Sequence, residues 1–186
     1  MKAVNKRNLA VVTLIVILVV FVMWRERDSE AVAVFKSQEL PTESGPRAGL
    51  LAPALTLQGS DGSTYQVGGK REKAVLLNFW ASWCDPCQQE APELNVIAAK
   101  YKDSLDIYGI NVTSHDYKPN AERFVKKFKL TFPVMYDQKG EAFAKYNGAV
   151  FPTNVLIDKN GVISEIILGI LTPEELEAKI TALIGS

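Results

Sequence analysis

The feature that most constrains the fold is an uninterrupted apolar stretch, AVLLNFWAS, at residues 74–82. A strand that is apolar on both faces needs cover on both faces, so this stretch predicts a central strand of a sheet. The residues that follow, from Cys84 to Tyr101, carry apolar side chains at helical spacing. A buried strand followed at once by an amphipathic helix is typical of α/β proteins.

The residues after position 100 continue this alternation, and a hairpin precedes it. The segment LDIYGINV has the apolar character of a second buried strand, and NAERFVKKFKL has the period of an amphipathic helix. Thr172 is followed by Pro-Glu-Glu, which predicts a final helix with a capping box. The predicted strands are residues 54–58, 63–67, 74–82, 105–112, 154–158 and 162–168. Together these elements predict an α/β three-layer sandwich with an N-terminal β-hairpin over residues 50–186.

The N-terminal segment has a different character. Residues 8–24 carry no charge and are almost wholly aliphatic, and their length lies at the short end of what a membrane-spanning helix needs. Lys2, Lys6 and Arg7 precede this run, so the positive-inside rule places the N-terminus in the cytoplasm. Residues 1–24 are therefore predicted to be a cytoplasmic stub and a single transmembrane signal-anchor, which attaches the protein to the membrane.

A cleaved signal peptide is the alternative for this segment, because Ala31–Ala33 has the small-x-small form of a cleavage site. The charged sequence RERDSE separates that site from the apolar run, which is also longer than the usual core of a signal peptide, so an uncleaved anchor is favoured. Residues 25–49 are polar and contain Pro and Gly, which is typical of a tether. The domain at residues 50–186 is then expected on the extracytoplasmic side of the cell membrane.

Charge and cysteine content narrow the function. Lys+Arg and Asp+Glu number 21 each, so the chain lacks the basic excess that nucleic-acid binding requires. Both cysteines, Cys84 and Cys87, lie in the turn ASWCDPC between the predicted strand and helix. A closed zinc site needs four ligands, but the chain has one histidine and no second cysteine pair, so no metal and no cofactor are predicted. An inert disulfide remains an alternative, although so short a loop stabilises a fold little.

The position of the two cysteines favours redox chemistry. The start of a helix after a central strand is where an α/β sheet presents reactive groups, and the helix dipole there favours an anion. We therefore expect Cys84 to attack, and Cys87, one turn further into the helix and more buried, to resolve the mixed disulfide. Pro86 suits the first helical turn because it has no N–H to lose there. Trp83 is expected to be exposed by the turn, and Trp83 and Pro86 are expected to line a substrate groove.

Three segments resemble a known family. NFWASWCDPC resembles the active-site strand and turn of thioredoxin-fold proteins, FPTNVLID resembles the loop that carries their cis-proline, and LLAPALTLQGSDGSTYQV resembles the N-terminal hairpin of the redoxin branch. With the predicted anchor and Glu90, the chain is most similar to the ResA/TlpA group of membrane-anchored, extracytoplasmic thiol–disulfide oxidoreductases. This resemblance covers the whole predicted domain. It implies a thioredoxin-like fold, a redox-active Cys84–Cys87 disulfide, and a substrate groove at Phe151 and the cis-proline Pro152.

The resemblance also implies a role for Glu90. Thioredoxin has a buried aspartate where this chain has Asn78, whereas ResA-type proteins use a glutamate at the Glu90 position as proton acceptor for the resolving thiol. Glu90 lies three residues after Cys87, on the same side of the predicted helix. The alternative for Glu90 is one more solvated helix carboxylate. The histidine of the chain, His115, is expected in a loop without a catalytic role.

The expected function is that of an extracytoplasmic dithiol reductant of protein disulfides. A cysteine pair outside the cytoplasm tends to become oxidised, so a reductant there needs electrons delivered across the membrane. The resemblance implies a CcdA-type transmembrane thiol donor and, as substrate, the CxxCH disulfide of apocytochromes c during cytochrome c maturation. Three alternatives stay open, namely a disulfide-forming oxidase of secreted proteins, a thiol peroxidase, and a non-catalytic binding module, which the intact Cys84/Cys87 pair disfavours. Peroxidases of this branch need a Thr-x-x-Cys pattern, which ASWC lacks.

Overall fold

The computed structural model describes residues 14–25 and 40–185. The chain forms two units, Met1–Leu40 and Pro41–Ser186, and each is described by itself. In the first unit, residues 14–25 are helical and their large apolar side chains are exposed. Within the described parts of the chain, every helix is too short or too polar to cross a membrane. Residues 8–13 of the predicted anchor lie outside the described residues, and the anchor stays a prediction.

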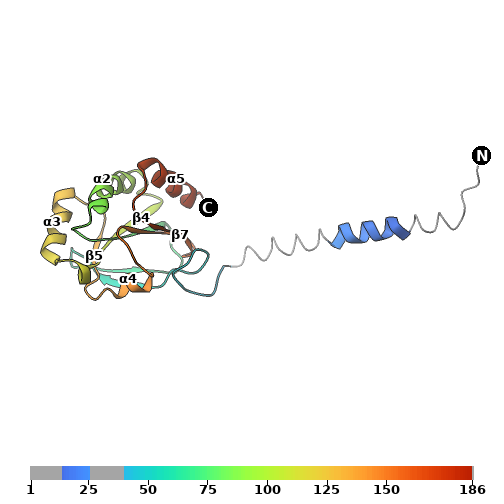
Figure 1. Cartoon of the computed structure of the whole chain (residues 1–186), viewed down its shortest axis with the longest axis horizontal. Coiled ribbons are helices and arrows are strands. Elements are labelled where there is room, and N and C mark those ends of the chain that lie inside the picture. Colours follow the sequence, from blue (N-terminus) through green and yellow to red (C-terminus); the bar gives the residue numbers. More distant parts are fainter. Residues whose placement is uncertain (1–13, 26–39, 186) are drawn as a thin grey trace, which may run out of the picture. The chain divides into compact units, whose positions relative to one another are not determined.

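The second unit holds a five-stranded sheet, a separate two-stranded hairpin and the helices that cover the sheet (Figure 1). Its strands are β1 (Leu55–Gln58), β2 (Thr64–Val67), β3 (Ala74–Trp80), β4 (Leu105–Asn111), β5 (Val134–Tyr136), β6 (Thr153–Ile157) and β7 (Ile163–Leu168). Its helices are α2 (Asp85–Lys100), α3 (Lys118–Phe128), α4 (Glu141–Lys145) and α5 (Pro173–Ile184), with a 3₁₀ turn, η1 (Thr113–His115). The capping box predicted at Thr172 is confirmed at the start of α5.

The strand order in the larger sheet is β5-β4-β3-β6-β7, with β3 in the centre. β4 runs parallel to β3 and β5, whereas β6 runs antiparallel to β3 and β7. All seven residues of β3 are buried, as its unbroken apolar sequence predicts. Because successive side chains of a strand point to opposite faces, β3 supplies both layers of the core. Val75, Leu77 and Phe79 belong to one layer, and Leu76 and Trp80 belong to the other.

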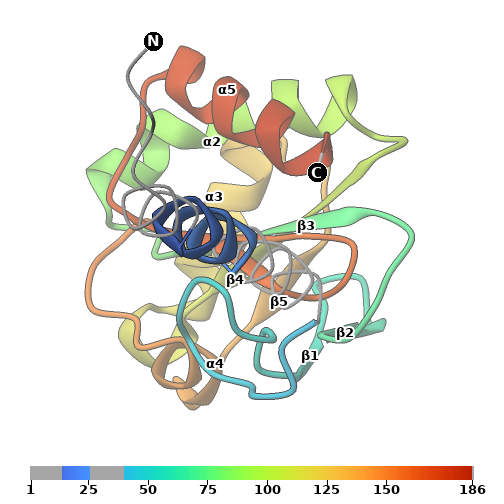
Figure 2. The same cartoon turned by 90° about the vertical axis from the view of Figure 1, so that its right-hand side faces the viewer.

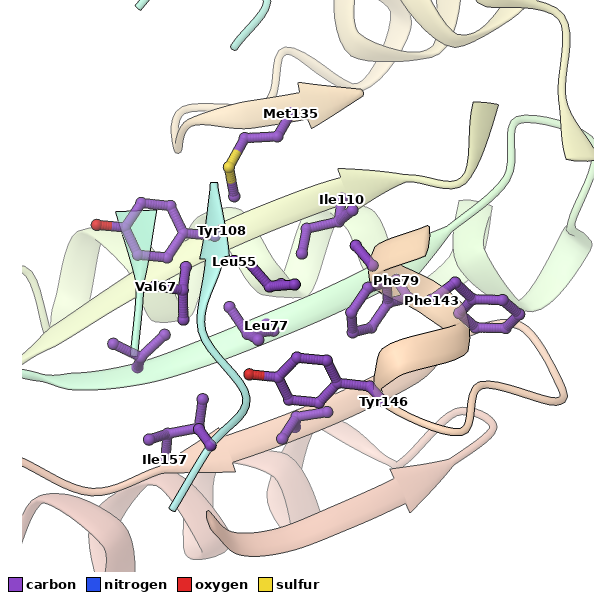
Figure 3. Close-up of a cluster of buried hydrophobic side chains, with 14 of the residues drawn as sticks. Leu55, Val67, Leu77, Phe79, Tyr108, Ile110, Met135, Phe143, Tyr146 and Ile157 are labelled. Carbon is purple, nitrogen blue, oxygen red and sulfur yellow. The ribbon is translucent and has the colours of Figure 1, made fainter. Parts of the chain in front are cut away.

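Figure 2 shows α2 and α5 on one side of the sheet, and α4 and the β1–β2 hairpin on the other. On the first side, Leu94 of α2 and Ile180 of α5 join the buried cluster that includes Leu76. On the other side, the rings of Phe79 and Phe143 lie 5.6 Å apart, within the cluster drawn in Figure 3. The predicted three-layer α/β arrangement and the N-terminal hairpin are thus confirmed.

The structure adds three short elements, β5, α4 and η1, and moves the start of the domain towards the N-terminus. Neither β5 nor α4 was predicted, because three and five residues are too few to show a hydrophobic period. Residues 41–49, which the sequence analysis assigns to the tether, belong to the second unit, Pro41–Ser186. They are held by backbone hydrogen bonds, from Leu51 N–H to the Glu43 carbonyl and from Gly49 N–H to the Ile163 carbonyl, and such bonds need no apolar pattern.

Candidate active site

Cys84 and Cys87 form a disulfide at the N-terminus of α2, with their Cα atoms 5.3 Å apart. Cys84 is the N-cap residue of the helix, and its Sγ accepts a hydrogen bond of 3.1 Å from the Cys87 N–H. Pro86 lies in the first turn, as predicted. The free N–H groups at a helix start favour negative charge on the N-cap side chain. This geometry therefore stabilises a thiolate at Cys84 once the disulfide is reduced.

Exposure does not distinguish the two cysteines, because Cys84 is 4% exposed and Cys87 is 3% exposed. The expected greater burial of Cys87 thus amounts to only a small difference in the disulfide form. Both residues belong to one buried cluster with Trp80 and Phe124, so the packing around the start of α2 covers both sulfurs alike. The two cysteines differ in what they face. A groove of about 790 Å³, called the dithiol groove below, is lined by Cys84 and not by Cys87.

Aromatic side chains form the walls of the dithiol groove. Its lining residues are Trp83, Cys84, Asp85, Pro86, His115, Gly140, Phe143, Ala144, Gly148, Ala149, Val150 and Phe151. Trp83 is 59% exposed, as the turn predicts, and its ring meets Phe151 edge-on with the centroids 5.7 Å apart. Phe151 in turn stacks on Phe143 at 4.8 Å. The groove is thus a mostly apolar slot beside one sulfur, which suits an extended polypeptide better than a charged small molecule.

Trp83, Pro86, Phe151 and Pro152 were predicted for this groove, and the structure places the first three in its lining. The prediction is wrong for Pro152, which is not among the lining residues. The side chain of Pro152 is buried next to Phe151 in the chain. The Phe151–Pro152 peptide bond is cis, as the resemblance implied. His115 was assigned no role, yet it lines the groove at the end of η1. Its ring meets Phe151 at 6.3 Å, and its carbonyl accepts the Trp83 Nε1–H at 2.8 Å.

Glu90 lies one turn after Cys87 on α2 and is only 4% exposed. The alternative of a solvated helix carboxylate is therefore wrong. Asn154 Nδ2 of β6 donates to Glu90 Oε1 at 2.6 Å, and Asn78 Nδ2 of β3 donates to Glu90 Oε2 at 2.9 Å. Asn78 Nδ2 also donates to Asn154 Oδ1 at 2.9 Å, so the three side chains form a closed ring of hydrogen bonds.

This ring decides how Glu90 titrates. Burial raises the pKa of Glu90 to about 7 from its ordinary 4.5, because desolvation disfavours the carboxylate. The hydrogen bonds from Asn154 and Asn78 act in the opposite direction, because they stabilise the charged form. A carboxyl group with a pKa near neutrality can both accept and release a proton under physiological conditions. Glu90, one helical turn after Cys87, thus has a pKa suited to a proton acceptor.

A second polar cluster holds the turn before the cysteines, and sequence reasoning missed it. Asp116 accepts hydrogen bonds from Ser82 N–H at 2.6 Å and from Ser82 Oγ at 2.7 Å. Asn111 Nδ2 donates to the same carboxylate at 2.8 Å. The strand order could have indicated this cluster. β3 and β4 are parallel neighbours, so the residues after their carboxyl ends meet at one edge of the sheet. Asp116 therefore fixes the segment that presents Trp83 and Cys84.

Comparisons with known proteins agree with this geometry. The family model described as Redoxin matches residues 47–184. A thioredoxin-like protein, YneN of Bacillus subtilis (strain 168), is 37% identical over 139 residues, covering 74% of this chain and 81% of that protein. The thiol-disulfide oxidoreductase ResA of Geobacillus kaustophilus (strain HTA426) is 38% identical over 130 residues, covering 69% of this chain and 74% of that protein.

Among solved structures, a putative thiol:disulfide interchange protein DsbE from Chlorobium tepidum superposes with a TM-score of 0.67 at 33% identity. The match covers 73% of this chain and 96% of that one. Residues 47–184, which the Redoxin model matches, contain the disulfide, the dithiol groove and the Glu90 ring. The chain therefore belongs to the redoxin family, and within it to the thiol–disulfide oxidoreductases.

Proposed function

We propose that this protein is an extracytoplasmic dithiol reductant that transfers electrons from its Cys84–Cys87 pair to disulfides of polypeptide substrates. One observation carries the proposal: of the two equally buried cysteines, Cys84 alone lines the dithiol groove, while Glu90 lies in the interior, one turn after Cys87. A nucleophile that faces a groove and a second thiol beside a proton acceptor are the parts that thiol–disulfide exchange requires.

The reaction starts from the reduced pair. The Cys84 thiolate attacks one sulfur of the substrate disulfide, which forms a mixed disulfide and releases the other substrate sulfur as a thiolate. Glu90, as carboxylate, takes the proton of the Cys87 thiol. The Cys87 thiolate then attacks Cys84 Sγ and expels the second substrate thiolate. The substrate gains two electrons, and the protein is left with the Cys84–Cys87 disulfide. A dithiol donor must reduce this disulfide again before the next cycle.

Charge near the cysteines supports the reducing direction. Asp85 directly follows Cys84, and Glu90, buried three residues after Cys87, adds a negative charge once the pH exceeds about 7. Negative charge near thiolates disfavours the reduced pair, and a dithiol whose reduced form is disfavoured is the stronger reductant. Residues 8–24 serve as the anchor in this proposal and keep the domain beside a CcdA-type donor in the membrane. The proposed substrate, taken from the resemblance to the ResA/TlpA group, is the CxxCH disulfide of apocytochromes c.

Equilibration of the purified protein with glutathione of known redox ratio tests the direction of transfer. We expect a reduction potential closer to the about −270 mV of thioredoxin than to the about −120 mV of a strong disulfide-forming oxidase. A potential near the oxidase value would establish the alternative, an oxidase of secreted proteins.

Trapping with a Cys87→Ser variant identifies the substrate, because this variant cannot expel the bound partner. On the cytochrome proposal the trapped partners include apocytochromes c linked through a CxxCH cysteine. Deletion of the protein should also deplete mature c-type cytochromes, and added reductant should restore them. Capture of secreted proteins with many cysteines, together with a defect that reductant worsens, would contradict this proposal.

A further inference from the structure

A second groove, of about 700 Å³, lies between the start of α2 and helix α3. Its lining residues are Ser82, Trp83, Gln88, Asn120, Arg123, Phe124, Lys126, Lys127 and Phe128. Trp83 lines both this groove and the dithiol groove, so the two grooves meet at the residue that precedes Cys84. An extended chain that lies over Cys84 can therefore continue past Trp83 into the second groove.

The charged side chains that line this second groove, called the cationic groove below, are all positive. Arg123, Lys126 and Lys127 line it, and its lining contains no carboxylate. Within residues 40–185, none of these three side chains takes part in an ion pair. Lys127 Nζ donates to Gln88 Oε1 at 3.0 Å, and Arg123 donates to Asn120 Oδ1. Neutral partners thus orient Arg123 and Lys127 and leave their charge uncompensated.

This charge is local. Residues 50–186 contain 14 Lys+Arg and 16 Asp+Glu, which gives a net charge of 14 − 16 = −2. Helix α3 (Lys118–Phe128) contains four of those cations and one carboxylate, Glu122. Lysines in the last turn stabilise a helix through its dipole, which accounts for Lys126 and Lys127 as single residues. It does not account for Arg123, nor for a groove that joins the dithiol groove.

The floor of the cationic groove is aromatic. Phe124 is buried and Phe128 is half-buried, with their ring centroids 4.5 Å apart. Cations above an apolar floor suit a peptide segment that carries carboxylates and also has apolar side chains to bury. A membrane surface is flat and does not enter a concave site of this kind.

We propose that the cationic groove binds an acidic segment of the same polypeptide whose disulfide lies over Cys84. This proposal rests on the proposed function, because it assumes a polypeptide substrate in the dithiol groove. Opposite charge on protein and substrate raises the rate of encounter, and the gain falls as salt screens it. The groove thereby selects among disulfides by the charge of the chain around them.

The test uses the reduced full-length protein and two synthetic peptides that contain the same internal disulfide. One peptide carries a glutamate tract beside the disulfide, and the other carries glutamine at the same positions. At low salt we expect the acidic peptide to be reduced roughly tenfold faster, and at about 0.5 M salt we expect the two rates to converge. Versions with the tract before and after the disulfide show in which direction the chain runs past Trp83.

A double substitution, Arg123→Gln with Lys126→Gln, should remove the preference for the acidic peptide. It leaves Lys127 and its Gln88 contact in place. The matched control is Lys70→Gln with Lys102→Gln, which removes the same charge from exposed positions outside both groove linings and should keep the preference. Thermal unfolding of each variant checks that the fold is intact.

The outcomes separate the two proposals. Equal rates for both peptides in the wild type, or equal loss of preference in both double variants, would overturn the cationic groove and leave the reductase intact. No exchange with either peptide would overturn the proposed function together with the groove. Equal peptide rates combined with charge-dependent binding of the wild type to anionic lipid vesicles, absent in the Arg123/Lys126 variant, would assign the surface to a membrane instead.

Discussion

The two cysteines of the disulfide are almost equally exposed, but their surroundings differ. On the Cys84 side lies the open dithiol groove, walled by Trp83 and Phe151, and the backbone N–H of Cys87 in the first turn of α2 donates to Cys84 Sγ. On the Cys87 side, deeper along α2, the protein encloses a carboxyl group, Glu90, and two amides that donate to it. In the proposed mechanism, the Cys84 side binds the partner and the Cys87 side accepts a proton.

From this difference we infer that the reactivity of each thiol follows from the neighbours of its sulfur and not from its accessible area. Cys84 and Cys87 are covered to the same degree, so a ranking by exposure would give them equal roles. The helix terminus stabilises negative charge on Cys84, whereas a buried carboxylate near Cys87 disfavours a second negative charge until it has taken up a proton. The predictions below test this division of roles, from the largest expected effect to the smallest.

Removing either sulfur should have opposite consequences. A Cys84→Ser variant should show no detectable exchange, because the thiol that faces the groove is absent. A Cys87→Ser variant should still attack and should accumulate a stable mixed disulfide with a peptide substrate. Non-reducing electrophoresis and mass spectrometry after incubation with an oxidised peptide distinguish the two. Accumulation of the mixed disulfide in the Cys84→Ser variant would reverse the assigned roles.

Glu90 should make the oxidised protein less stable as the pH rises. Its pKa is about 7 in the folded state against an ordinary 4.5, so between these values the folded state binds more protons than the unfolded state. The free energy of unfolding should therefore fall through this window by about 3 kcal/mol. A Glu90→Gln variant should lose this dependence, whereas Glu93→Gln, at a half-buried position on the same helix, should keep it. Urea unfolding of the three proteins at pH 4 and pH 8 measures the free energy of unfolding. An identical pH dependence in all three would show that Glu90 does not cause it.

The same carboxyl group should control the second chemical step. Glu90→Gln should lengthen the lifetime of the mixed disulfide by at least about tenfold near neutral pH, because Cys87 loses its proton acceptor. In the wild type the rate of this step should increase as the pH rises through about 7, where Glu90 becomes a carboxylate. The variant should lack that increase. Rapid-quench measurement of the mixed disulfide after mixing with peptide provides the rates, with Glu93→Gln as the control.

The amide ring should set the pH at which this step operates. An Asn154→Leu variant removes one of the two amide donors to the Glu90 carboxylate, so the pKa of Glu90 should rise further and the pH midpoint of resolution should move up by about one. The control is Asn95→Leu, which removes a hydrogen bond to the Phe128 carbonyl but touches no part of the ring. A structural role alone would slow both variants without moving either midpoint, which would contradict the assignment.

The sequence predicted the centre of this molecule better than its edges. An unbroken apolar stretch at β3, a cysteine pair at the start of α2 and a capping box at α5 each leave a local pattern, and each is confirmed. The short elements β5 and α4 leave none, because tertiary contacts decide their structure. Residues 41–49 illustrate the same point, since backbone hydrogen bonds hold them in place.

The candidate site divides in the same way. Cys84, Cys87, Glu90, Trp83 and Phe151 could be proposed because each follows from spacing or from a matched motif. The partners of Glu90 could not, because Asn154 lies 64 positions from it in the chain and meets it only where β6 pairs with β3. Asp116 and His115 were missed for a related reason. Both lie in a polar stretch, which predicts a solvent-exposed loop, and only the pairing of the strands brings this loop beside the cysteine turn.

The most direct test of the central claim compares the reactivity of the two thiols one at a time. In the reduced Cys87→Ser variant only Cys84 can be alkylated, and in the Cys84→Ser variant only Cys87 can. At pH 7 we expect Cys84 to react with iodoacetamide at least about tenfold faster than Cys87, because the helix terminus stabilises its thiolate. Equal rates, or a faster reaction at Cys87, would contradict the claim that the surroundings of the two sulfurs assign their roles.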